Sequence, residues 1–154
     1  MKTILWALLS LAVMIADASA DEARWTAGLR AELHPTVSGV AETSFYSYTV
    51  TGALTLKVGQ AEQAMAVHCT GLDKSGSDGV EGTGACTWTD NEGGVIYAEL
   101  KTNADGNDYT VMGGTGRWRG AQGALRSTFA FLPGPSSSFM LLTESGSGSL
   151  ELAQ

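Results

Sequence analysis

The chain has 154 residues, a length that fits a single domain. Its 9 Lys and Arg residues against 16 Asp and Glu residues give a net charge of −7, and an acidic protein repels phosphate backbones, so nucleic-acid binding is not expected. With 44% hydrophobic and 16% charged residues, the composition is that of a globular protein and excludes a disordered one.

The first twenty residues have the pattern of a secretory signal peptide. Lys2 gives a positive start, residues 4–15 are almost entirely apolar, and Ala18-Ser19-Ala20 is a small-residue cleavage site. As a helix, this apolar run would span about 18 Å, too short for a hydrocarbon core of about 30 Å. We therefore expect cleavage after Ala20, a mature domain at residues 21–154, and a secreted or periplasmic protein that does not span a membrane.

The mature part alternates between apolar and polar residues almost throughout, which is the pattern of half-buried β-strands. The first two strands are predicted at residues 25–33 and 36–43. A long strand follows, with Tyr46, Tyr48, Val50, Gly52, Leu54, Leu56 and Val58 on one face. Later strands are predicted at residues 95–102, 109–112, 124–132, 139–143 and 150–152.

Turn residues separate these predicted strands. Pro133-Gly134-Pro135 is expected to end the strand before it, and residues 146–149 are expected to form a polar turn. Short turns and the absence of an amphipathic helix indicate one all-β domain, an antiparallel sandwich or barrel. The 20 glycines suit a closed sheet, because glycine permits bulges and sharp coiling.

The two cysteines lie in a predicted hairpin. If the chain turns between Ser77 and Asp78, Cys69 lies opposite Cys86. Directly opposed residues of antiparallel strands are about 4.5–5.5 Å apart, which is within disulfide reach. Export permits disulfides, and the spacing differs from the C-x-x-C of redox-active pairs. We expect a structural disulfide between Cys69 and Cys86.

Residues 111–123 form a distinctive glycine-rich segment. No helix follows them, which argues against a dinucleotide-binding loop and leaves a tight turn with a buried aromatic ring as the structural interpretation. The residues of this motif are Gly113, Gly114, Thr115, Gly116, Trp118, Gly120 and Gly123.

Gly113-Gly114-Thr115-Gly116, then a basic residue, an aromatic one, and Gly120-Ala121-x-Gly123, resembles the signature of the allene oxide cyclase/dirigent barrel superfamily. The resemblance implies a small antiparallel β-barrel of about eight strands, with an apolar lumen and a calycin-like outline. Plant members cyclise a fatty-acid epoxide or steer phenolic radical coupling, without cofactors. Trp118 stands where the family usually has Phe, so we expect Trp118→Phe to be tolerated.

Candidate ligand residues are those expected to point into the lumen: Tyr46, Tyr48, Trp88, Tyr97, Glu99, Phe129 and Phe131. Glu99 would be a buried acid or base if its face were the lumen. The opposite face, with Ile96, Ala98 and Leu100, is more uniformly apolar and favours a solvated Glu99. His34 and His68 have no metal-ligand cluster at suitable spacing, so no metal or cofactor is expected.

Two functions fit these observations. The first is an exported barrel that binds a small apolar or phenolic molecule, or a protein partner, without catalysis. The second is a cofactor-free cyclase or isomerase that uses the lumen as a mould, which would require a cavity of about 300 Å³ or more. No family catalytic residue maps onto this sequence, so enzymatic activity stays open, as do the oligomeric state and the identity of the ligand.

Overall fold

The computed structural model describes residues 20–37, 43–136 and 139–153. The predicted signal peptide therefore lies almost wholly outside the described residues, as does most of the strand predicted at 36–43. Besides a single 3-10 turn, η1 (Gly116–Trp118), the described elements are strands: β1 (Asp21–Val37), β2 (Ser44–Val58), β3 (Ala61–Gly76), β4 (Gly79–Asp90), β5 (Val95–Asn103), β6 (Gly106–Gly114), β7 (Gln122–Ser136) and β8 (Phe139–Glu151).

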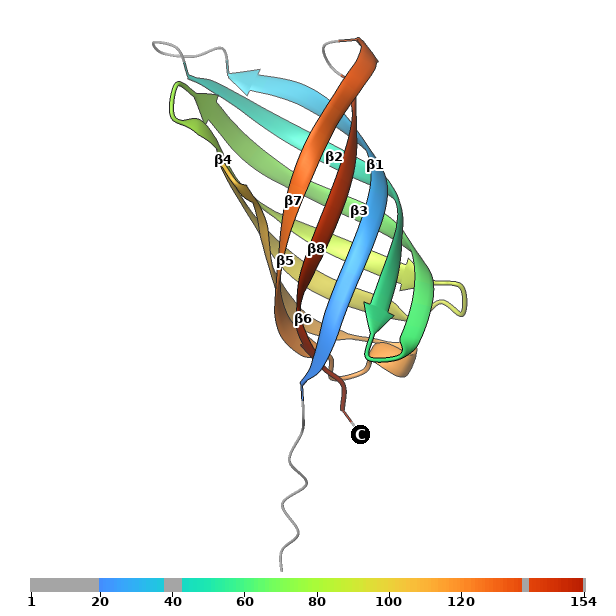
Figure 1. The fold of residues 1–154 in the computed structure, drawn as a ribbon. Coiled ribbons are helices and arrows are strands. Elements are labelled where there is room, and N and C mark those ends of the chain that lie inside the picture. The colour runs from blue at the N-terminus through green and yellow to red at the C-terminus, as the bar shows by residue number, and fades with distance from the viewer. Residues whose placement is uncertain (1–19, 38–42, 137–138, 154) are drawn as a thin grey trace, which may run out of the picture.

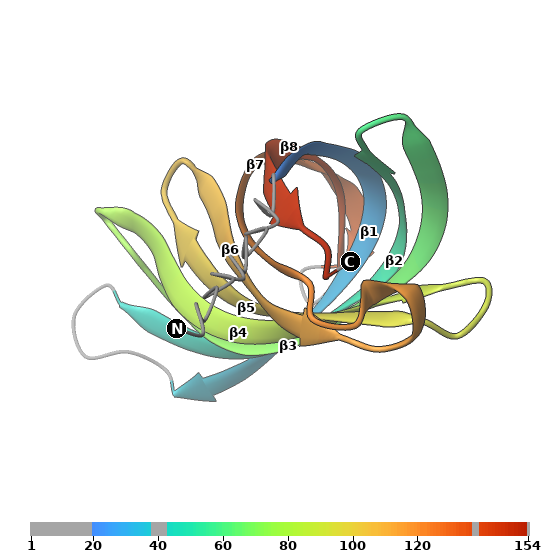
Figure 2. The same ribbon diagram turned by 90° about the horizontal axis from the view of Figure 1, so that it is seen from below.

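The strands form a closed antiparallel barrel in which each strand pairs with the next along the chain and β8 pairs with β1. Figures 1 and 2 show the strands wound around a common axis. The upper end in Figure 1 carries the β3–β4 and β5–β6 turns, and the lower end carries the β2–β3 and β4–β5 turns and η1. The predicted small barrel of about eight strands is confirmed.

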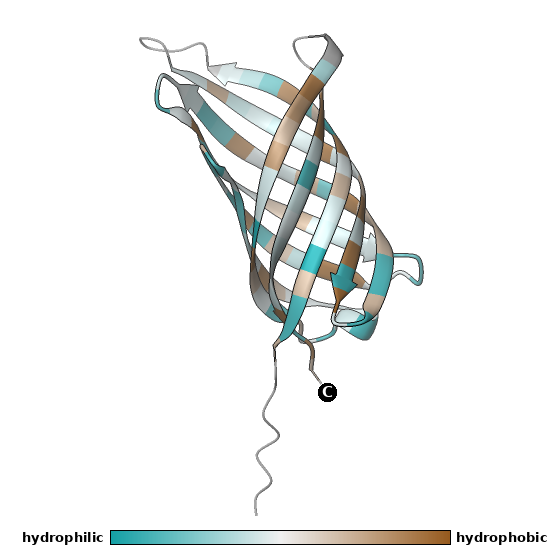
Figure 3. Ribbon diagram, viewed as in Figure 1, coloured by the Kyte–Doolittle hydropathy of each residue, from teal (hydrophilic) through white to brown (hydrophobic). Residues whose placement is uncertain are grey.

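The period of two in the sequence assigns each residue to the inside or the outside of the barrel. On β5, Ile96, Ala98 and Leu100 are buried, while Tyr97 and Glu99 between them are exposed. Figure 3 shows the same alternation of polar and apolar residues along the strands. The apolar faces of the strands thus meet inside one shared core, as expected for a sheet closed on itself.

The predicted disulfide is present. Cys69 of β3 lies opposite Cys86 of β4 in the register that a turn at Ser77 and Asp78 requires. The two residues form a disulfide with their Cα atoms 4.1 Å apart, and both are buried. The bond joins neighbouring strands on the lumen side of the barrel.

Two predicted turns are wrong, because β7 and β8 are longer than expected. Residues 133–135 stay within β7, but the ladder shifts register between Leu132 and Ser136, so the prolines occupy a bulge where no ladder donor is required. Residues 146–149 are also strand, paired on both sides. At Gly146 a Cβ would lie 2.2 Å from the Trp25 ring, so the glycine makes room for that ring.

The lower half of the lumen is filled by aromatic rings. Trp25, Trp88 and Tyr109 pack with ring centroids 5.4–5.8 Å apart, and each ring is almost fully buried. Trp88, one of the expected ligand residues, is therefore part of a packed core. These rings leave the upper half as the part of the lumen to examine for a ligand cavity.

Candidate functional site

The glycine-rich segment closes the lower end of the barrel. Trp118 of η1 is 5% exposed. The Thr115 hydroxyl accepts a hydrogen bond from Val95 N–H (3.1 Å), and Thr115 N–H donates to the Val95 carbonyl (2.8 Å), which ties η1 to the start of β5. Gly113, Gly116 and Gly120 have positive φ, whereas Gly114 and Gly123 lie where a Cβ would meet a backbone oxygen at 2.5 and 2.2 Å. These residues shape a plug at the lower end.

A buried carboxylate holds this plug in place. Asp90 Oδ1 accepts hydrogen bonds from the N–H groups of Gly94 (2.7 Å) and Glu92 (2.9 Å), and Oδ2 accepts one from Trp118 Nε1 (2.9 Å). Burial works against the charged form, but these donors and Arg117, 3.4 Å away, hold the pKa of Asp90 below its usual value. Every strong acceptor position is occupied, so Asp90 has a structural role. The sequence alone did not single out Asp90.

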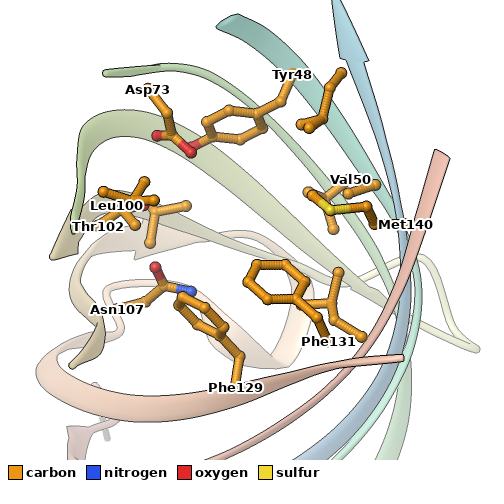
Figure 4. A pocket seen from close by; sticks show the side chains of 13 residues that line it. Tyr48, Val50, Asp73, Leu100, Thr102, Asn107, Phe129, Phe131 and Met140 are labelled. Atoms are coloured by element: carbon orange, nitrogen blue, oxygen red, sulfur yellow. The ribbon is translucent and has the colours of Figure 1, made fainter. Parts of the chain in front are cut away.

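The upper half of the lumen contains a cavity of about 90 Å³ (Figure 4). All eight strands contribute to its wall, which is mainly aliphatic and aromatic. The lining residues are Ala31, Leu33, Tyr48, Val50, Asp73, Val80, Leu100, Thr102, Asn107, Phe129, Phe131, Met140 and Leu142.

The sequence candidates divide between cavity, core and surface. Tyr48, Phe129 and Phe131 line the cavity, and Tyr46 is half-buried on β2 without belonging to the lining. Tyr97 and Glu99 do not reach the lumen: Tyr97 is 43% exposed and Glu99 is also on the outer face. The inward positions of β5 belong to Ile96, Ala98 and Leu100, the face that the sequence favoured as buried, so Tyr97 and Glu99 are not lumen residues.

Three polar atoms buried at the cavity have no hydrogen-bond partner within the described part of the chain: the Tyr48 hydroxyl, Asp73 Oδ1 and Asn107 Oδ1. Figure 4 shows the Tyr48 hydroxyl and the Asp73 carboxylate pointing toward the same region. Burial raises the pKa of Asp73 to about 6. Burial, and then the charge of Asp73, raise the pKa of Tyr48, and the nearby Thr102 side chain, which does not reach hydrogen-bonding geometry, acts in the opposite direction.

Glycine on β4 makes the position of the Tyr48 ring possible. A Cβ at Gly84 would lie 2.4 Å from the Tyr48 hydroxyl, so only glycine lets that hydroxyl lie against the wall of the barrel. The inward glycines of β4 thus provide space that other residues would fill. The cavity and its polar groups both depend on that space.

A second buried carboxylate lies directly below the cavity. Glu144 of β8 is 4% exposed, and its Oε1 accepts hydrogen bonds from Asn107 Nδ2 (2.9 Å), the Tyr109 hydroxyl (2.8 Å) and the Ser127 hydroxyl. Asn107 therefore connects Glu144 to the cavity. Its amide nitrogen donates to Glu144 and its amide oxygen lies at the cavity.

The sequence analysis missed Asp73, Asn107 and Glu144 as site residues. Asp73 lies a few residues before the turn predicted at Ser77 and Asp78, Asn107 lies between two predicted strands, and Glu144 precedes the wrongly predicted turn at 146–149. Extending the period of two would have identified two of them, since Asp73 continues the face of Cys69 and Glu144 continues that of Leu142. Among the described residues, no three His, Cys, Asp or Glu lie close enough together to hold a metal ion.

Comparison with known proteins supports the fold. No family model and no curated protein matches the chain. Among solved structures, a pterocarpan synthase dirigent protein matches with a TM-score of 0.52 at 12% identity, covering 96% of this chain and 100% of that one. This chain has the dirigent barrel fold. The barrel fold that the resemblance of the glycine segment implied is thus confirmed.

The structure corrects our expectation for Trp118 in this dirigent-type barrel. Phe in its place would remove the indole N–H that donates to Asp90 and leave a buried carboxylate oxygen without that donor. We predict that Trp118→Phe lowers the free energy of unfolding measurably. Trp118→Ala should lower it further, by about 3–5 kcal/mol, because it also opens a cavity. Urea denaturation measures both; a Trp118→Phe protein as stable as the wild type would show that the hydrogen bond contributes nothing.

The raised pKa of Asp73 predicts a pH dependence of stability. The folded state binds the Asp73 proton more tightly than the unfolded state, where the pKa is near 3.8. The resulting stabilisation is complete below about pH 3.8 and is lost as the pH rises through about 6. Relative to Asp73→Asn, the wild type should therefore lose stability between pH 4 and pH 6. A difference in unfolding free energy that is constant over this range would contradict the assignment.

Proposed function

We propose that the chain is an exported barrel that binds a small apolar or phenolic molecule in the upper cavity, without catalysis. The observation that carries the proposal is the group of unpartnered polar atoms on Tyr48, Asp73 and Asn107 in a cavity whose other lining residues are apolar except for Thr102. A buried polar group without a partner costs about 1–3 kcal/mol, and a few convergent polar groups in an apolar wall are typical of ligand sites. A bound molecule with a polar group would supply the missing partners.

The size of the cavity limits the ligand. About 90 Å³ is less than the roughly 150 Å³ of an engineered cavity that binds benzene. A single ring would therefore fill the space, and any further part of the molecule would extend past Phe131, which is 53% exposed at the upper end.

The same volume argues against the cyclase or isomerase hypothesis. A mould that folds a long, flexible substrate must enclose it, and such sites occupy about 300 Å³ or more. The cavity here provides less than a third of that. Because pockets for drug-sized ligands also occupy about 300 Å³ or more, the binding hypothesis is limited to a molecule that places a single small ring in the cavity.

Calorimetric titration with phenol and with 4-methylphenol tests the proposal. We expect binding with a Kd of about 1 mM or below, equivalent to about −4 kcal/mol, which lies within the range for a ligand of seven or eight heavy atoms. Met140→Trp should abolish binding because the larger ring fills the cavity that Met140 lines.

Leu141→Trp is the matched control, since Leu141 is the next residue on β8 and is 38% exposed. It should bind both phenols as the wild type does. The proposal fails if neither phenol binds the wild type, or if Met140→Trp binds them undiminished.

The proposal of export rests on the pattern of residues 1–20 and on the Cys69–Cys86 disulfide, a bond typical of oxidising compartments. No helix in the described part of the chain is long and apolar enough to cross a membrane. In a bacterial host, intact mass measurement of the exported fraction should give an oxidised chain that begins at Asp21. A chain that stays in the cytoplasm with residues 1–20 attached would contradict export.

A further inference from the structure

We propose that Glu144 makes the upper cavity selective for hydrogen-bond donors, by holding the side chain of Asn107 with its oxygen toward the ligand. The inference rests on the proposed ligand binding and names the chemical class of the ligand, a small ring that carries a hydroxyl or another N–H or O–H group. Glu144 acts as a positioning residue in this scheme, because it does not itself line the cavity.

The hydrogen bonds of Glu144 fix the orientation of the Asn107 amide. Glu144 Oε1 accepts from Asn107 Nδ2 at 2.9 Å and from the Tyr109 hydroxyl at 2.8 Å, and the Ser127 hydroxyl donates to the same oxygen. If the amide were turned over, Asn107 Oδ1 would face Oε1, and two acceptors would meet without a proton between them. Asn107 Oδ1 is therefore the atom left facing the cavity, where it has no partner among the described residues.

The other polar groups of the cavity agree with this selectivity. Asp73 Oδ1 is also unpartnered, and with a pKa of about 6 its carboxyl group is largely ionised at neutral pH and can only accept hydrogen bonds. The third group, the Tyr48 hydroxyl, can donate or accept. Two of the three free polar atoms thus require a donor, and a ligand oxygen without hydrogen would be repelled by both.

Three single-ring probes of similar size test the inference: phenol, which donates; toluene, which has no polar group; and benzaldehyde, which only accepts. For the wild type at pH 7.5, we expect phenol to bind at least tenfold more tightly than toluene, and benzaldehyde to bind no better than toluene. A site whose buried acceptors are left unpaired discriminates against an analogue that lacks the donor.

Two variants at position 144 distinguish a role of Glu144 in orienting the Asn107 amide from a role in stability alone. Glu144→Gln keeps an acceptor oxygen for Asn107 Nδ2 and should keep the preference for phenol. Glu144→Leu removes the acceptor, so the amide can turn, and the ratio of phenol to toluene affinity should fall toward one. Toluene affinity in Glu144→Leu should stay near the wild-type value, which shows that the cavity is intact.

Each outcome has a distinct meaning. Equal binding of the three probes to the wild type overturns the donor preference alone, and leaves ligand binding in place. An unchanged ratio of phenol to toluene affinity in Glu144→Leu overturns the role of Glu144. Failure of all three probes to bind overturns the proposed function, and the donor preference with it.

Discussion

Closing eight strands into a barrel leaves an interior just wide enough for its own side chains or for one small ligand, and this limit on volume governs the rest of the structure. A large ring that points inward must lie opposite a residue with little or no side chain. Trp25 fits because Gly146 lies beneath its ring, and the Tyr48 hydroxyl fits because Gly71 and Gly84 form the wall against it. Three rings fill the lower half of the lumen, whereas the glycines of the upper half leave space that Tyr48 occupies only in part. The position of the proposed ligand site thus follows from where rings and glycines face each other.

The three buried carboxyl groups differ in how fully their oxygens are hydrogen-bonded. Asp90, at the lower end, accepts hydrogen bonds at both oxygens and fixes the plug. Glu144, in the middle, gathers three donors on one oxygen. Asp73, at the upper end, has an oxygen with no partner among the described residues. An unpaired buried polar group is costly, and along this series of carboxyl groups the unpaired oxygen is the one at the upper end, where we propose the ligand site.

The sequence predicted the architecture well because apolar residues at every second position identify the face of each strand that packs in the core. It paired Cys69 with Cys86 because a two-residue turn leaves one possible register. It failed where inward residues are glycine or charged. Gly146 was interpreted as a turn, yet the Trp25 ring that requires it comes from a strand more than a hundred residues earlier. Glu144 and Asp73 were missed for a related reason: their burial depends on partners from other strands, which no local pattern shows.

The central claim, that the upper cavity is a ligand site, is tested most directly by a crystal structure of the protein soaked with 4-bromophenol. The bromine scatters anomalously, so its position is found independently of the refined coordinates. Our account predicts a bromine peak beside Phe129 and Phe131, with the phenol oxygen within hydrogen-bond distance of Asn107 Oδ1 or Asp73 Oδ1. Ordered water molecules alone on the Tyr48 hydroxyl, Asp73 and Asn107, with no bromine peak in the lumen, would contradict it.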